Sequence, residues 1–114
     1  MSMLRIKRGD NHPACRIRMI SRTTNLPMDL EGASVLFSMI DSNGSYAVQD
    51  AVGSIGVDVE GIASIVQYAW DSGDTDVEGI YRGEFLIDSD VGLFRIPVEG
   101  YFPIIIGPSI TSTI

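Results

Sequence analysis

The chain has 114 residues, of which 45% are hydrophobic and 20% charged, and its formal net charge is −7. This length is typical of one domain, so we expect residues 1–114 to form a single domain with an apolar core. The net acidity argues against nucleic acid as a partner, because phosphate binding needs a basic face. No signal pattern is visible and no apolar run approaches the ~20 residues that cross a bilayer, so we expect neither secretion nor a membrane partner.

Apolar residues recur at every second position, which predicts β-strands, and no long segment keeps a helical period. In chain order, the expected strands cover residues 2–8, 14–20, 33–40, 45–51, 54–59, 62–70, 80–88, 93–98 and 101–106. Asn43-Gly44 is the clearest hairpin turn, because Asn-Gly tolerates the positive φ angles of a tight turn. Pro103 predicts an edge position for the last strand, because proline cannot donate to a ladder. Short strands with turns at about ten-residue intervals are typical of a sandwich or barrel.

The segment around residues 70–85 has the pattern of a chain that crosses between the two sheets of a sandwich. A large aromatic residue ends one apolar run, a polar loop follows, and Tyr81 opens an alternating strand. Tyr81 is a candidate for the tyrosine corner of immunoglobulin-like sandwiches, where a Tyr hydroxyl bonds to the backbone just upstream. One helical turn in the loop would be capped by Asp74 or Thr75. The expected structural corner consists of Trp70, Asp74, Thr75, Gly79 and Tyr81.

The loop over residues 71–78 contains four carboxylates, which are Asp71, Asp74, Asp76 and Glu78. Calcium takes several oxygen ligands, so this loop is a candidate cation site. The alternative, which we favour, is a turn whose Asp side chains accept backbone hydrogen bonds, because the spacing is not that of a helix–loop–helix calcium site. We therefore expect no metal and no cofactor.

Catalytic patterns are weak in this sequence. Paired carboxylates could serve a glycosidase, but nothing marks one of these acids as buried. His12 is the only histidine, and no nucleophile-elbow pattern accompanies it. Cys15 is the only cysteine, so no internal disulfide forms, and its expected role is that of a small buried hydrophobe. We expect no enzyme and no catalytic residue.

Two kinds of surface residue suggest interfaces. Six of the eight basic residues lie within residues 1–22, a pattern typical of neighbouring strands with solvated basic faces. The alternative is a basic edge that docks onto the acidic face of a neighbour. The candidate interface residues are Arg5, Lys7, Arg16 and Arg18 in the basic strands and Phe102, Ile104 and Ile106 in the apolar C-terminal run. An alternative is a carbohydrate-binding module that uses exposed aromatics such as Tyr46 or Tyr101, with a cation in the 71–78 loop.

Several short segments together span nearly the whole chain: Arg8-Gly9-Asp10, residues 27–39, residues 70–85 with Gly79-Ile80-Tyr81, Pro97-Val98-Glu99-Gly100-Tyr101, and residues 104–106. In these segments the chain resembles the N-terminal β-sandwich domain of the baseplate upper proteins of tailed bacteriophages and related short prophage tail proteins. The resemblance implies an all-β, immunoglobulin-like antiparallel sandwich of about eight strands. It also implies a non-catalytic assembly module of a tail or baseplate.

The same resemblance implies the setting in which such a module works. Its partners would be other phage tail or baseplate proteins, with homo-oligomers expected, and its location would be the virion after synthesis in the host bacterial cytoplasm. The larger baseplate proteins continue into further domains, whereas this chain ends after the sandwich, so we expect a stand-alone component.

Overall fold

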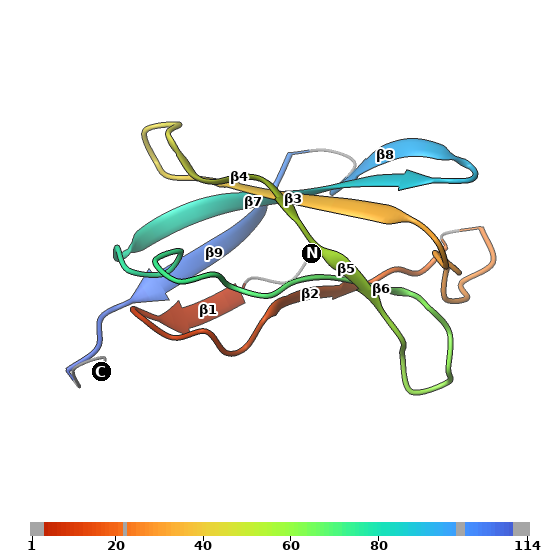
Figure 1. The fold of residues 1–114 in the computed structure, drawn as a ribbon, viewed down its shortest axis with the longest axis horizontal. Helices are drawn as coiled ribbons and strands as arrows, with labels where there is room; N and C mark the ends of the chain where they lie inside the picture. Colours follow the sequence, from red (N-terminus) through yellow and green to blue (C-terminus); the bar gives the residue numbers. More distant parts are fainter. Residues whose placement is uncertain (1–3, 22, 98–99, 111–114) are drawn as a thin grey trace.

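The computed structural model describes residues 4–21, 23–97 and 100–110, and within them every regular element is a strand (Figure 1). The strands are β1 (Leu4–Lys7), β2 (Cys15–Arg18), β3 (Ser34–Ile40), β4 (Tyr46–Val52), β5 (Ser54–Gly56), β6 (Ile65–Tyr68), β7 (Gly79–Ser89), β8 (Gly92–Ile96) and β9 (Phe102–Gly107). The predicted all-β class is confirmed, and each expected strand has a counterpart. The expected strand ends at residues 2–3 and 98 lie outside the described residues.

The strands form two packed sheets, as in an immunoglobulin-like sandwich. The large sheet has the order β1-β9-β7-β3-β4, with β8 also paired to β7, and the small sheet has the order β2-β6-β5. β9 and β8 lie end to end along one side of β7, because β9 pairs with residues 79–83 and β8 with residues 85–89. The pairs are antiparallel except for β1 and β9, which are parallel. No helix in the described ranges could span a membrane.

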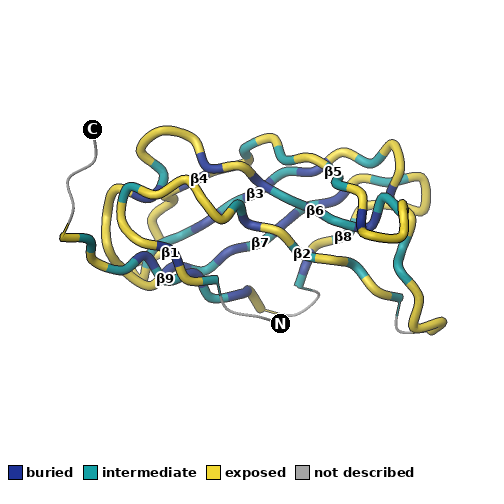
Figure 2. Tube along the Cα trace, turned by 90° about the horizontal axis from the view of Figure 1, so that it is seen from below, coloured by how far each residue is buried: buried dark blue, intermediate teal, exposed yellow. Residues whose placement is uncertain are grey.

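Alternation along the strands puts one apolar set between the sheets. Figure 2 shows buried positions that alternate with intermediate or exposed ones along β3, β7 and β9. Phe37 of β3 occupies the centre of the core, and its ring centroid lies 4.7 Å from that of Tyr68 and 5.0 Å from that of Phe85. Trp70 meets the Phe37 ring edge-on at 5.8 Å. The two sheets are therefore joined mainly by aromatic side chains.

The hairpin between β3 and β4 forms at the predicted Asn-Gly turn. Gly44 has a φ of +86°, which costs glycine nothing because it has no Cβ. Asp41 closes the turn, since its Oδ1 accepts hydrogen bonds from the backbone N–H groups of Asn43 at 2.9 Å and Ser45 at 3.0 Å. This turn could be predicted from the sequence because the hydrogen bonds that Asp41 Oδ1 accepts are local.

The prediction that the last strand lies at an edge is wrong. β9 lies inside the large sheet, between β1 and β7. Pro103 is tolerated because it pairs with Arg82 of β7, while the described ladder with β1 begins one residue later, at Leu4 and Ile104. Within sheets, proline is also found at the start of a strand, and Pro103 is the second residue of β9.

Candidate functional site

The segment between β6 and β7 is a structural corner, as predicted. The Tyr81 hydroxyl donates a hydrogen bond to the Val77 carbonyl at 2.7 Å, which is the tyrosine-corner contact. The Thr75 hydroxyl donates to the Asp10 carbonyl at 2.8 Å, and the Trp70 indole N–H donates to the Pro13 carbonyl at 2.9 Å. Gly79 is the first residue of β7. The bonds from Thr75 and Trp70 join the corner to the loop between β1 and β2.

Replacing Tyr81 by phenylalanine tests the tyrosine corner. Tyr81 is buried, so the variant leaves the Val77 carbonyl without its partner, at a cost of about 1–2 kcal/mol in the free energy of unfolding. Chemical denaturation measures this loss. Tyr46→Phe is the matched control, because that ring is 58% exposed and its loss of a hydroxyl should leave stability unchanged. Equal stability of Tyr81→Phe and the wild type would refute the corner.

In the acidic loop, the Asp74 carboxylate accepts hydrogen bonds from the loop backbone and from a core residue. Asp74 accepts a hydrogen bond from the Tyr68 hydroxyl and another from the Asp71 backbone N–H at 2.8 Å. Burial and the bond to Asp74 raise the pKa of Tyr68, which keeps the donor protonated. Residues 72–75 form turns rather than the expected helical turn. Among the described residues, no group of three or more His, Cys, Asp or Glu side chains is placed to hold a metal ion.

Cys15 lies in β2 and points into the core. Its side chain is almost completely buried, and this burial raises the pKa of the thiol to about 12. A thiol with this pKa stays protonated and is a poor nucleophile. Cys15 therefore packs as a small hydrophobe, in agreement with the sequence interpretation.

The structure separates the predicted basic surface into two parts. β1 and β2 are edge strands of different sheets. Arg5 is the register partner of Ile105 and points to the outer side of the large sheet, together with Lys7, whereas Arg16 and Arg18 point to the outer side of the small sheet. Arg22 lies outside the described residues. The four described candidate residues remain exposed, but they cannot act as one patch.

The predicted interface role of the C-terminal run needs a correction. Phe102, Ile104 and Ile106 are at most 2% exposed and form part of the core, so their side chains are unavailable to a partner. The outward residues of β9 are instead the alternate ones, Pro103 and Ile105. Because side chains alternate strictly along a strand, an error of one position exchanges the two faces.

Apolar side chains that the sequence analysis missed lie on the outer side of the large sheet, which they share with Ser38, Arg82 and Glu84. These apolar side chains point away from the core on three neighbouring strands, and we call them the outer apolar face: Leu36, Ile40, Ile80, Leu86 and Ile105. Register pairs join Leu36 with Leu86 and Ile80 with Ile105, and Ile80 is 63% exposed. A sandwich sheet that faces water usually carries polar residues there. The signal was present in β3 and β9, whose apolar residues are consecutive rather than alternating.

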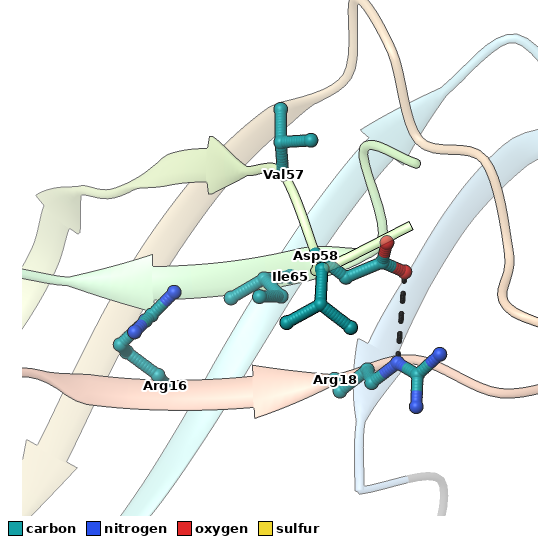
Figure 3. Close-up of a pocket in the computed structure, with 6 residues that line it drawn as sticks. Arg16, Arg18, Val57, Asp58 and Ile65 are labelled. Carbon is teal, nitrogen blue, oxygen red and sulfur yellow. Dashed lines mark ion pairs between the residues drawn. The ribbon is translucent and has the colours of Figure 1, made fainter. Parts of the chain in front are cut away.

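A hollow of about 440 Å³ lies on the outer side of the small sheet, lined by Arg16, Arg18, Val57, Asp58, Val59 and Ile65 (Figure 3). Asp58 organises its rim. Its Oδ1 accepts from the backbone N–H groups of Glu60 and Ile62, and its Oδ2 accepts from the Ser64 hydroxyl at 2.6 Å. The Ser64 bond, the two backbone bonds and the Arg18 charge together hold the pKa of Asp58 below 3.8, against the opposing effect of burial.

Comparisons with known proteins support the fold and leave the function open. No protein-family model matches the chain, and no curated protein matches it by sequence. The fold is similar to that in the crystal structure of CopC from Methylosinus trichosporium OB3b, with a TM-score of 0.53 and 12% sequence identity. The alignment covers 99% of this chain and 91% of that chain. At this sequence identity, the similarity shows a shared β-sandwich architecture and does not show a shared activity.

Proposed function

We propose that this chain is a non-catalytic structural protein of a bacteriophage or prophage tail or baseplate, which acts as an assembly module. We propose a place in the virion because the sequence resembles that of the baseplate upper proteins of tailed bacteriophages. The outer apolar face is the observation that carries the assembly role, because its side chains, with Ile80 exposed and the other four partly exposed, leave water when a partner covers them. The occupant we propose is the apolar face of another tail or baseplate subunit.

The charges around the outer apolar face are suited to such docking. Arg5 of the edge strand β1 is the register partner of Ile105, and Arg95 of β8 lies 3.7 Å from Glu84 of β7. The Arg82 guanidinium lies 5.0 Å from the centroid of the exposed Tyr101 ring and donates to the Asp41 carbonyl. Protein interfaces are enriched in Arg and aromatic residues, so Arg82 and Tyr101 are suited to lie within one.

Co-purification with the products of the neighbouring reading frames tests this role. Tagged wild-type chain should retain an identified tail or baseplate protein, and Ile80→Glu should weaken that complex by about thirtyfold or more, because a buried unpaired charge costs at least about 2 kcal/mol. Val91→Glu is the matched control, since Val91 is 85% exposed in the β7–β8 turn, away from this face. Retention of no tail protein, or equal retention by Ile80→Glu, would contradict the proposal.

A carbohydrate-binding module is the second candidate, and one observation favours it. Tyr46 and Tyr101 are 58% and 52% exposed, and both lie at one end of the outer face: Tyr46 pairs with Ile40, Ile40 pairs with Arg82, and Arg82 contacts Tyr101. Exposed rings of this kind stack on sugars. Titration with glycans separates the candidates, because only a sugar-binding module would bind them and lose that binding on Tyr46→Ala.

A further inference from the structure

The hollow on the small sheet contains one arginine, Arg16, that has no charged partner among the described residues. Arg18 forms long ion pairs with two acids, since its Nε lies 3.6 Å from Asp58 Oδ2 and one Nη lies 3.8 Å from Glu60 Oε1. Arg16 makes no ion pair or hydrogen bond with any described residue, and its side chain is exposed. The Asp58 carboxylate already accepts hydrogen bonds from two backbone N–H groups of its own loop and from the Ser64 hydroxyl. The hollow can therefore accept a further carboxylate at Arg16.

The rest of the lining is apolar. Val57 is 60% exposed, Val59 is 99% exposed, and Ile65 is half-buried on the outer side of β6. Figure 3 shows Ile65 on β6, between Val57, which directly follows β5, and the two arginines of β2. An occupant that matches this lining has a carboxylate for Arg16 and an apolar side chain for the valines.

The chain itself contains such a segment in its corner. Asp76-Val77-Glu78 places an exposed valine, at 67%, between two exposed acids, and neither acid forms an ion pair with the described residues. The Tyr81 hydroxyl holds the Val77 carbonyl, so the backbone of the segment is already ordered. A preordered segment loses less conformational entropy when it binds.

The two surfaces cannot meet within one molecule. The corner follows the end of β6 at Tyr68, whereas the hollow lies at the start of β6 at Ile65 and at the turn that precedes it. Figure 1 shows the β5–β6 turn and the β6–β7 segment toward opposite ends of the long axis, which measures 44 Å. Contact between them therefore needs a second copy.

We propose that Asp76-Val77-Glu78 of one copy inserts into the hollow beside Arg16 and Arg18 of the next copy. The inference rests on the proposed role in assembly and names a head-to-tail contact between identical subunits. The interface is heterologous, because different surfaces of the two copies meet. Such contacts close into rings or extend into filaments.

Charge reversal tests this contact on the purified full-length chain, with sedimentation velocity at low salt as the readout. The wild type should form species larger than a dimer as concentration rises, and high salt should weaken them. Arg16→Glu alone and Glu78→Arg alone should each weaken association at least about tenfold, because like charges then face each other. An equimolar mixture of the two variants should associate again, since each hollow then meets a corner of opposite charge.

The controls and contrary outcomes are well defined. Asp90→Arg reverses an exposed acid in the β7–β8 turn of the other sheet and should associate like the wild type. A monomeric wild type at millimolar concentration, an Arg16→Glu variant that associates normally, or a mixture that stays monomeric would each overturn the contact. If the wild type is monomeric and Arg16→Glu instead abolishes capture of another tail protein, the hollow belongs to that protein: the head-to-tail contact is then overturned while the assembly role stands.

Discussion

Replacing Phe37 by alanine is expected to lower the free energy of unfolding by about 3–5 kcal/mol, the range for a large aromatic residue removed from a packed core. Phe37 is fully buried and contacts aromatic rings from both sheets, with Tyr68 stacked at 4.7 Å and Phe102 at 6.3 Å between centroids. The variant would leave a cavity at the point where the sheets meet. For a domain of this size, such a loss is a large part of the total stability.

Urea denaturation followed by tryptophan fluorescence measures the Phe37→Ala effect, because Trp70 is the only tryptophan and contacts Phe37. Leu36→Ala is the matched control, since Leu36 is the next residue of the same strand and points outward. It should cost less than about 1 kcal/mol. Similar losses of stability in the two variants would contradict the orientation of β3, in which Phe37 points into the core and Leu36 points outward.

Gly53→Ala should destabilise the fold by about 1–3 kcal/mol through steric overlap. Gly53 joins β4 of the large sheet to β5 of the small sheet, and its N–H donates to the Val35 carbonyl at 2.9 Å. A Cβ at this position would lie 2.6 Å from the Gln67 carbonyl oxygen and 2.9 Å from Val35 Cγ1. The first of these atoms belongs to the backbone, so a side-chain rotation cannot relieve the contact.

Gly107→Ala is the control for Gly53→Ala. A Cβ at Gly107 would have as its nearest neighbour the Ile6 carbonyl oxygen, at 4.0 Å, so stability should change by less than about 0.5 kcal/mol. Thermal unfolding of the two variants gives the comparison. A Gly53→Ala variant as stable as Gly107→Ala would show that the close approach of β6 to this crossing is not required.

Strand positions were predictable because they depend on local patterns. Alternation located β3 and β7 to within about one residue. The Asn43-Gly44 turn identified β4 as the hairpin partner of β3. Expected strands such as 54–59 and 62–70 proved longer than β5 and β6, because Asp58 closes a turn with its own backbone and with Ser64. The Asp58 side chain makes these bonds, and the alternation of apolar residues does not report them.

The candidate interfaces were less predictable, because they depend on contacts between distant segments. Phe102 and Ile105 have similar hydropathy, yet one lies in the core and the other on the outer apolar face. The choice between them follows from the register of β9 against β7 and β1. The hollow likewise combines β2 with the turn before β6, and only the pairing of Arg18 with Ile65 brings these elements together.

The corner between Trp70 and Tyr81 contains both kinds of information. Its hydrogen bond from Tyr81 to Val77 spans four residues, so the spacing of a tyrosine after a short polar loop was enough to anticipate it. The bond from Thr75 to the Asp10 carbonyl spans 65 residues, and no pattern in either segment announces it. Local periodicity thus determines where strands and turns form, because it reflects the geometry of neighbouring residues. The order of strands, the covered faces and the hollow come from packing between distant segments, which only the folded chain brings together.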